Sequence, residues 1–280
     1  MSQWKYSVAC SDCIKEGQPL LIEGSLEEVL VKAAKLGYDA IEYHTCEDAN
    51  FDIDRINKIK TENKIEISAI VTGRLATMGK STLLSESRSD SKAALEGLLK
   101  YIDLAKALNT NIIIGWAKGN IPDNEQKKYY FDKLSKLFSQ ICKYAKKSEV
   151  KVLVEEINRY ETNLFNTADQ FLDFINKYKI DNCYAHLDTF HMNIEESSLV
   201  EAIKKTGNKL GYLHVADNNR KIPGNGSINF SEIFNTLKQV QYTGYVSVEC
   251  LPGEDGVKTA NKALIYLKQI DRVLNYGGII

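Results

Sequence analysis

The sequence predicts an α/β protein, a single (β/α)8 TIM barrel formed by residues 1–280. Eight short apolar runs of strand length alternate with amphipathic segments of helix length along the whole chain. Each strand–helix unit takes roughly 30 residues, and eight such units give the length expected of a closed barrel. No Gly-x-Gly-x-x-Gly follows the first strand and no phosphate-loop motif is present, which disfavours the nucleotide-binding open sheets. The chain has four prolines and no Gly/Ser tract, so no linker divides it.

The composition is that of an ordinary soluble globular protein. Hydrophobic residues make up 44% of the chain and charged residues 26%, and a formal net charge of −1 gives no general attraction to nucleic acid or anionic membranes. No apolar run approaches membrane-spanning length, and the opening MSQWKYSVAC lacks the pattern of a signal peptide. The six cysteines are scattered, as is usual for free thiols in the cytosol. We therefore expect a cytoplasmic protein that acts on a small molecule and has no nucleic-acid or membrane partner.

The first helix carries the clearest local signals of the first half. It follows a strand predicted over residues 5–10 (KYSVAC). Ser25 and Glu28 form a capping box, in which each side chain accepts a hydrogen bond from a free backbone N–H. Gly37 ends the helix, because glycine readily adopts the left-handed conformation found there. The apolar face of this helix consists of Val29, Leu30, Ala33 and Ala34.

Three further strands complete the first half. Residues 38–44 and 65–71 are short apolar runs, and residues 111–116 (NIIIGW) are almost continuously apolar, as in a strand buried on both faces. Helices with apolar residues on one face are predicted over residues 51–63, 90–108 and 123–148. The polar stretch of residues 72–89 is long enough to act as a lid over a site.

The second half repeats the alternation four times. Its strands are short runs that end in polar residues, over residues 151–156, 183–187, 210–215 and 245–249. Its helices are amphipathic segments, over residues 167–179, 195–206, 230–240 and 260–274. Thr167 supplies the N-cap of the first of these helices, and the acidic pair Glu195 and Glu196 suits the opening turn of the second.

Four chemically active side chains close four successive strands of this half. They are Glu155, Asp188, His214 and Glu249. In a barrel of parallel strands, the C-terminal strand ends converge on one pocket. One such residue would be unremarkable as a solvated strand end, but four in succession, each closing an apolar run, indicate a common site. Three carboxylates and one imidazole suit Mn²⁺, Mg²⁺ or Co²⁺ better than a structural zinc ion, which favours thiolates.

Longer strings surround these residues. They are EEINRYET from Glu155, LDTFHMNIEE from Leu187, HVADNNR from His214 with PGNG from Pro223, and VE from Val248. Together they resemble the ketose 3-epimerases of the D-tagatose/D-psicose type, which belong to the xylose-isomerase-like barrel superfamily. The second string is the most specific of them. The resemblance covers residues 151–252, and the first half shares only the architecture.

The resemblance implies a sugar epimerase that inverts carbon 3 of a ketose or keto-sugar acid through a metal-bound enediolate. It implies one divalent metal, Mn²⁺ in the first place and otherwise Mg²⁺ or Co²⁺, held by Glu155, Asp188, His214 and Glu249. The catalytic residues would be Glu155 and Glu249, facing the substrate from opposite sides. The residues expected to contact substrate oxygens are Glu161, His191 and Arg220. A homodimer or homotetramer is also implied.

The reaction itself requires groups of this kind. A proton next to a ketone is weakly acidic in water, and a metal that bridges the carbonyl and the neighbouring hydroxyl stabilises the enediolate formed when the proton leaves. Inversion needs one carboxylate to remove the proton from one face and a second to return a proton on the other. Glu155 and Glu249 supply such a pair, tuned by metal charge and burial.

The substrate does not follow from the resemblance. Epimerases that act on free ketohexoses carry an aromatic-rich stretch after the first strand, where this chain has SVACSDC from Ser7 to Cys13. Arg74 follows the third strand and Lys118 the fourth. Each could pair with a carboxylate or phosphate on the substrate, or lie solvated on a loop. A keto-sugar acid is therefore one of the substrates to test.

Other polar residues near the strand ends have less defined roles. Glu42 and His44 end the second strand, and could reach the pocket or lie at the surface. His186 shares a strand face with Asp188, so we expect it in the barrel interior as a core or supporting residue rather than a ligand. The Cys10–Cys13 pair has no second pair and no nearby histidine, so no metal or redox role is expected.

Three other functions are open to such a barrel. An aldose–ketose isomerase of the hydroxypyruvate-isomerase type shares the metal, the glutamates and the enediolate, but returns the proton to the neighbouring carbon. An abasic-site endonuclease of DNA repair uses three zinc ions and many histidines, whereas this chain has four histidines and a net charge that does not favour DNA. A non-catalytic sugar-binding protein would not need two opposed carboxylates.

Overall fold

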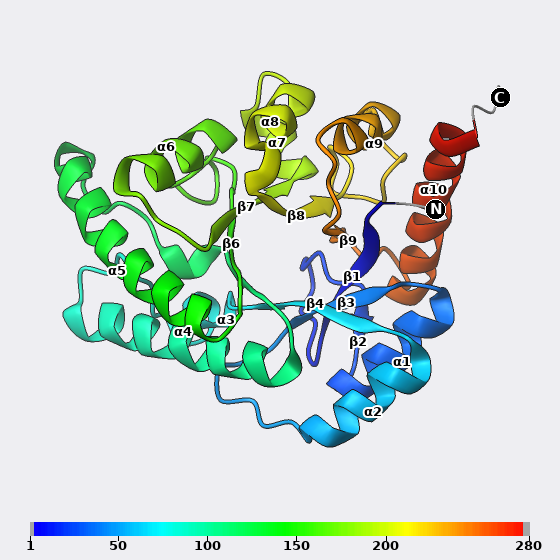
Figure 1. Ribbon diagram of the computed structural model, residues 1–280, viewed down its shortest axis with the longest axis horizontal. Coiled ribbons are helices and arrows are strands. Elements are labelled where there is room, and N and C mark those ends of the chain that lie inside the picture. Colours follow the sequence, from blue (N-terminus) through cyan, green and yellow to red (C-terminus); the bar gives the residue numbers. More distant parts are fainter. Residues whose placement is uncertain (1–2, 277–280) are drawn as a thin grey trace.

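Eight parallel strands close into a barrel in the computed structural model, which describes residues 3–276. Each strand of the ring pairs with the next along the chain, and β9 pairs with β1 to close it (Figure 1). The ring consists of β1 (Lys5–Ser11), β3 (Ala40–His44), β4 (Glu66–Val71), β5 (Ile112–Ile114), β6 (Val152–Glu155), β7 (Cys183–Asp188), β8 (Leu210–Val215) and β9 (Tyr245–Val248). The predicted TIM barrel is confirmed. A short strand that was not predicted, β2 (Ile22–Glu23), pairs with the end of β1.

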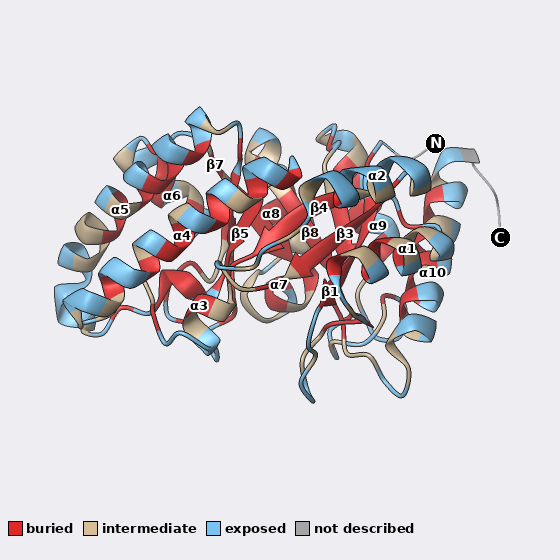
Figure 2. Ribbon diagram, turned by 90° about the horizontal axis from the view of Figure 1, so that it is seen from below, coloured by how far each residue is buried: buried red, intermediate tan, exposed pale blue. Residues whose placement is uncertain are grey.

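Helices surround the strands, as Figure 2 shows by their exposed outer faces and buried inner faces. They are α1 (Leu26–Leu36), α2 (Ile53–Asn63), α3 (Arg74–Thr77), α4 (Arg88–Leu108), α5 (Lys127–Lys147), α6 (Ala168–Tyr178), α7 (Thr189–Glu195), α8 (Leu199–Thr206), α9 (Phe230–Gln239) and α10 (Gly256–Tyr276). Short 3-10 turns occur at η1 (Trp116–Lys118), η2 (Asn124–Gln126) and η3 (Gly207–Lys209). Within residues 3–276, no helix has both the length and the apolar character needed to cross a membrane.

The predicted capping signals form the expected bonds. The Ser25 hydroxyl accepts from the backbone N–H of Glu28 at 3.3 Å, and the Glu28 carboxylate accepts from the N–H of Ser25 at 3.0 Å. Gly37 ends α1 with a φ of 90°, a left-handed conformation that glycine adopts without steric cost. The Thr167 hydroxyl likewise caps α6. Local side-chain chemistry therefore sets these helix ends as the sequence indicated.

The segment after β7 differs from the prediction. Helix α7 begins immediately after the strand, because Asp188 Oδ1 accepts from the N–H of Phe190 at 2.8 Å and caps it. Glu195 therefore ends α7, and the prediction that the acidic pair opens a helix is wrong. Its charges are used elsewhere: Glu195 accepts from Arg159 Nε at 2.9 Å and Glu196 accepts from the N–H of Ala168 at 2.8 Å.

Hydroxyl groups fill part of the barrel interior below the strand ends. The Ser7 and Ser68 hydroxyls lie 2.8 Å apart, and Ser68 also bonds the Tyr212 hydroxyl at 2.6 Å. All three residues are completely buried. Polar side chains therefore pack the interior, and the site above them lies at the C-terminal ends of the strands.

Candidate active site

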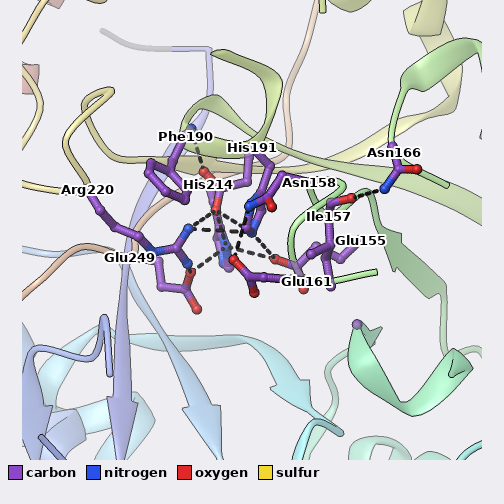
Figure 3. A network of polar contacts seen from close by, with 12 residues as sticks. Glu155, Ile157, Asn158, Glu161, Asn166, Phe190, His191, His214, Arg220 and Glu249 are labelled. Atoms are coloured by element: carbon purple, nitrogen blue, oxygen red, sulfur yellow. Dashed lines mark hydrogen bonds and ion pairs between the residues drawn. The ribbon is translucent and has the colours of Figure 1, made fainter. Parts of the chain in front are cut away.

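The four predicted ligands meet at the C-terminal end of the barrel. One ligand atom from each of Glu155, Asp188, His214 and Glu249 lies within 4.8 Å of all the others. His214 Nδ1 is 3.9 Å from Glu155 Oε1, 3.9 Å from Asp188 Oδ2 and 3.5 Å from Glu249 Oε2. Figure 3 shows Glu155 and Glu249 on either side of His214. Four consecutive strands of the ring thus bring one imidazole and three carboxylates together.

The arrangement fits a single divalent cation. His214 Nδ1 is buried and has no hydrogen-bond partner among the described residues, yet it points at three carboxylate oxygens. A buried imidazole nitrogen in such a setting either carries a proton or binds a metal. Three carboxylates and one imidazole are the donor set of a hard, oxygen-preferring ion. The residues present therefore fit the metal that the sequence predicts.

The two glutamates of this cluster differ electrostatically. Burial, followed by repulsion from Glu249, raises the pKa of Glu155 to about 8. Burial opposes ionisation of Glu249 too, but the charges of His214 and Arg220 outweigh it and lower the pKa of Glu249. Burial also disfavours the charged form of His214, yet Glu42 and Glu249 raise the pKa of its imidazole. Without a metal, these shifts favour the protonated forms of Glu155 and His214.

This distribution of protons makes a measurable prediction. We expect Mn²⁺ binding at pH 7 to release on the order of one to two protons, because the ion needs deprotonated ligands. Since the pKa of Glu155 is raised to about 8, the apparent affinity should increase from pH 6 to pH 8. Titration calorimetry in two buffers of different ionisation enthalpy measures the release. A binding enthalpy and affinity independent of buffer and pH would contradict it.

His191 lies beside the cluster on α7 and is 2% exposed. Its Nδ1 accepts from Asn158 Nδ2 at 2.7 Å; the amide is oriented this way because Asn158 Oδ1 accepts from the N–H of Tyr160. Neutral His191 therefore carries its proton on Nε2, which is 3.7 Å from Asp188 Oδ2 and 3.9 Å from Glu155 Oε1. A hydrogen-bond donor thus faces the place where a substrate would sit.

Arg220 covers the other side of the cluster. Its guanidinium donates to Glu249 Oε2 at 2.7 Å, reaches Asp188 Oδ2 at 3.5 Å and stacks 4.5 Å from the centre of the Phe190 ring (Figure 3). The Arg220 backbone has a φ of 56° and is tied down on both sides, since its N–H donates to Asp217 and its carbonyl accepts from Leu251. The loop therefore presents a fixed cation rather than a solvated one.

Glu161 lies at the mouth of the same pocket. It is exposed, and its Oε1 accepts from Asn158 Nδ2 at 3.0 Å. Asn158 thus orients both His191 and Glu161, two of the three predicted substrate contacts. Neither Asn158 nor Phe190 was predicted as a site residue, although both lie within strings that resemble the ketose 3-epimerases.

Glu42 is the residue whose role the sequence left most open. It is completely buried, and its two oxygens bond two imidazoles: Oε2 lies 2.6 Å from His214 Nε2 and Oε1 lies 3.0 Å from His44 Nε2. Acceptance of the Nε2 proton by Glu42 leaves Nδ1 of His214 to face the carboxylates. His44 lines the pocket, with 18% of its side chain exposed. Of the two alternatives, His44 reaches the pocket, whereas Glu42 lies at neither the pocket nor the surface but is buried against His214.

Lys118 and Arg74, the two residues predicted as possible partners of a charged substrate, occupy different environments. Lys118 is completely buried, and its Nζ donates to the carbonyls of Gly115 at 3.1 Å and Glu155 at 3.0 Å. Burial lowers the pKa of Lys118 to about 8. Its ammonium group is bound to the carbonyl of the last residue of β6, and it does not line the pocket, so it is not placed to contact a substrate. Arg74 does line the pocket, but it is bound to Ser11 and forms an ion pair with Asp12.

The remaining residues considered from the sequence are His186 and the two neighbouring cysteines, Cys10 and Cys13. His186 is completely buried, with its ring 4.1 Å from that of His214 in an edge-to-face contact. It supports His214 from inside the barrel, and its own nitrogens have no partner among the described residues. Cys10 is buried and Cys13 is exposed, and both are free thiols.

Comparison with known proteins agrees with this geometry. Residues 30–270 match the family described as "Xylose isomerase-like TIM barrel". An L-ribulose 3-epimerase of Methylomonas sp. (strain DH-1) is 27% identical over 266 residues, which cover 86% of this chain and 90% of that protein. A D-psicose 3-epimerase of Ruminiclostridium cellulolyticum is 32% identical over 234 residues, which cover 81% of this chain and 78% of that protein.

Solved structures show the same fold. A structure of L-ribulose 3-epimerase superposes with a TM-score of 0.81 at 24% identity, covering 99% of this chain and 98% of its own. A D-psicose 3-epimerase with D-tagatose from Clostridium cellulolyticum H10 superposes with a TM-score of 0.78 at 25% identity, covering 95% and 99%. The match extends over the first half of the chain, which the sequence strings did not cover.

Proposed function

The chain belongs to the xylose isomerase-like TIM barrel family, and we propose that it is a metal-dependent epimerase that inverts carbon 3 of a ketose or keto-sugar acid. Its similarity to named epimerases over most of their length makes it an isomerase that acts on carbohydrates. The observation that supports the finer proposal is that Glu155 and Glu249 lie on either side of His214 in a cluster that could hold a metal ion.

The metal would be held by Glu155, Asp188, His214 and Glu249. When bound, it supplies positive charge that stabilises negative charge developing on the substrate oxygens. We propose Mn²⁺ for this role, with Mg²⁺ and Co²⁺ as alternatives. Activity that is lost with a chelator and restored best by Mn²⁺ would support this choice, and full activity in the chelated protein would contradict it.

The protein groups divide the proton transfers between them. One of the two carboxyls, Glu155 or Glu249, accepts the proton from carbon 3, and the other, which carries a proton at that stage, returns it on the opposite face. In the reverse direction the two exchange roles. His191 Nε2–H, the Arg220 guanidinium and Glu161 would bind substrate oxygens and fix which carbon lies between the glutamates.

Proton exchange in deuterated water tests the reaction type. A panel of ketoses, keturonates and their phosphates is incubated with Mn²⁺ and, as a control, with a chelator, and products are followed by NMR. An epimerase places deuterium at carbon 3 and yields the carbon-3 epimer. Deuterium at the neighbouring carbon with an aldose product would instead identify an isomerase of the hydroxypyruvate-isomerase type. Binding without exchange on the whole panel would identify a sugar-binding protein.

The panel also decides the substrate charge. Arg74 lines the pocket and could bind a carboxylate at the end of the substrate remote from its carbonyl. Its ion pair with Asp12 would first have to rearrange. We therefore expect a keturonate to be turned over no faster than the matching neutral ketose. A clear preference for the keturonate would contradict this. We also propose that the protein is cytoplasmic and forms a homodimer or homotetramer. Analytical ultracentrifugation would measure the oligomeric state.

A further inference from the structure

A second cavity adjoins the pocket that holds the candidate ligands. The pocket has a volume of about 290 Å³ and the adjoining groove about 610 Å³. The groove runs along α3, the loop before α4 and the segments that follow η1 and β6. Both cavities are lined by the same three side chains, Thr77, Trp116 and Glu161, and so they meet there. A ligand larger than the pocket could therefore continue into the groove.

Trp116 stands at the junction. It begins η1 directly after β5, and 44% of its surface is exposed, which is unusual for so large an apolar side chain. None of the ring contacts or hydrogen bonds described for residues 3–276 engages its indole. A free indole face packs well against the apolar face of a sugar ring, and its N–H can donate to a hydroxyl.

The groove is preformed. The N–H of Leu83 donates to the carbonyl of Ala117 at 2.9 Å, and Lys133 Nζ donates to the carbonyl of Ser85 at 3.1 Å. The polar stretch that the sequence suggested as a lid is thus anchored to η1 and α5 and forms a wall. A ligand that binds there does not have to order this loop, which favours affinity.

The groove wall combines apolar side chains with hydroxyls and carboxylates, and no described side chain that lines it is positively charged. Thr82, Ser85 and Glu86 offer two hydroxyls and a carboxylate, and Glu161 adds a second carboxylate at the junction. No lysine or arginine of the described chain lines it. Sugar hydroxyls can bond to all of these groups, whereas a phosphate or carboxylate would be repelled.

We propose that the preferred substrate is a neutral glycosyl ketose, in which the end of the ketose remote from its carbonyl carries a second sugar ring seated in the groove. This inference rests on the proposed function, which places the carbonyl end at the candidate ligands. Three of those ligands, Asp188, His214 and Glu249, are buried and the side chain of Glu155 is only 13% exposed, whereas 44% of Trp116 is exposed. The distal carbons of a bound ketose therefore point toward the groove, and a ring attached there reaches the indole.

Matched substrates test the proposal. D-fructose is compared with 4-O-β-D-galactosyl-D-fructose and 6-O-α-D-glucosyl-D-fructose, each of which keeps a free carbonyl end, by deuterium incorporation at carbon 3 in the Mn²⁺-loaded protein. We expect kcat/KM for at least one glycosyl ketose to exceed that for D-fructose by about tenfold or more. An enzyme that epimerises free ketoses but favours neither glycosyl ketose would overturn the inference and leave the proposed function intact. Absence of exchange with every ketose would refute the proposed function itself.

Variants that fill the groove locate the effect. Ser85 and Ala76, the latter in α3, line the groove but not the pocket. The substitutions Ser85→Trp and Ala76→Trp should each reduce kcat/KM for the preferred glycosyl ketose about tenfold or more. Both should leave D-fructose within about twofold. Ser89→Trp is the matched control, because Ser89 is exposed and lines neither cavity. Equal losses on both substrates would overturn the inference. An unchanged glycosyl-ketose rate in Ser85→Trp would also overturn it. If that variant had in addition lost its oligomeric state, the groove would instead bind a second copy of the chain.

Discussion

Glu155→Gln and Glu249→Gln proteins, saturated with Mn²⁺, will each turn over the best ketose about 10³-fold more slowly than the unaltered protein, or not at all. Glutamine keeps the shape of either side chain but can neither accept nor return a proton. Because the two carboxyls lie on either side of the cluster, neither can replace the other. The measurement is deuterium incorporation at carbon 3, with the bound metal quantified for each variant so that lost binding is not mistaken for lost chemistry.

Glu156→Gln is the matched control for this experiment. Glu156 directly follows β6, and its N–H still donates to the carbonyl of His186 in β7, so its side chain leaves the chain on the face opposite to that of Glu155. It is buried, and burial raises its pKa well above the usual range, so the neutral amide resembles the native state. Near-normal turnover is expected. Retention of substantial activity by either Glu155→Gln or Glu249→Gln would refute a two-base mechanism.

Glu42→Gln will weaken Mn²⁺ binding by about 10- to 100-fold. The Glu42 carboxylate accepts from His214 and His44 with different oxygens, and an amide has only one acceptor oxygen for the two imidazoles. The His214 ring would then lose the partner that aims Nδ1 at the carboxylates. Since Glu42 does not line the pocket, much of the turnover should return at saturating Mn²⁺.

Calorimetric titration with Mn²⁺ checks this result. Glu66→Gln is a useful control, because Glu66 begins β4 at the opposite end of the barrel and bonds Lys5 and Tyr245. Its metal affinity should equal that of the unaltered protein. An unchanged affinity in Glu42→Gln would mean that Glu42 does not position His214, whereas an unrecoverable loss of turnover would indicate a direct part in the reaction.

The sequence predicted the barrel and its ligand cluster because both depend on local patterns. Strands buried on both faces appear in the sequence as apolar runs. Glu155 and Asp188 are the last residues of such runs, so the sequence places each of them at the end of its strand. Ring closure then brings successive strand ends together without further information. Lys118 shows the limit of this reasoning: it follows a strand end too, but the η1 turn directs it beneath β6.

The link between Glu42 and His214 could not be predicted in the same way. The two residues are 172 positions apart, and their contact depends on strand stagger across the barrel. The pairing of β3 with β4 also shifts register between Ile41 and Glu42, an irregularity that redirects side chains and has no reliable sequence signal. Likewise, α7 forms because Asp188 caps it with one oxygen while the other faces the cluster.

Glu42 also constrains how this barrel can be re-engineered. All four candidate ligands come from β6, β7, β8 or the residue directly after β9, whereas much of the pocket wall, including Ser11, Arg74 and Trp116, comes from the first half. Swapping the N-terminal half for that of another barrel would therefore alter which sugars fit while keeping every ligand. Such a chimera would still lose the support of His214 unless the donor places a carboxylate where Glu42 lies. Changes in the first half can thus alter the pocket wall, but they must keep the contacts that Glu42 makes to His214 and that Lys118 makes to Glu155.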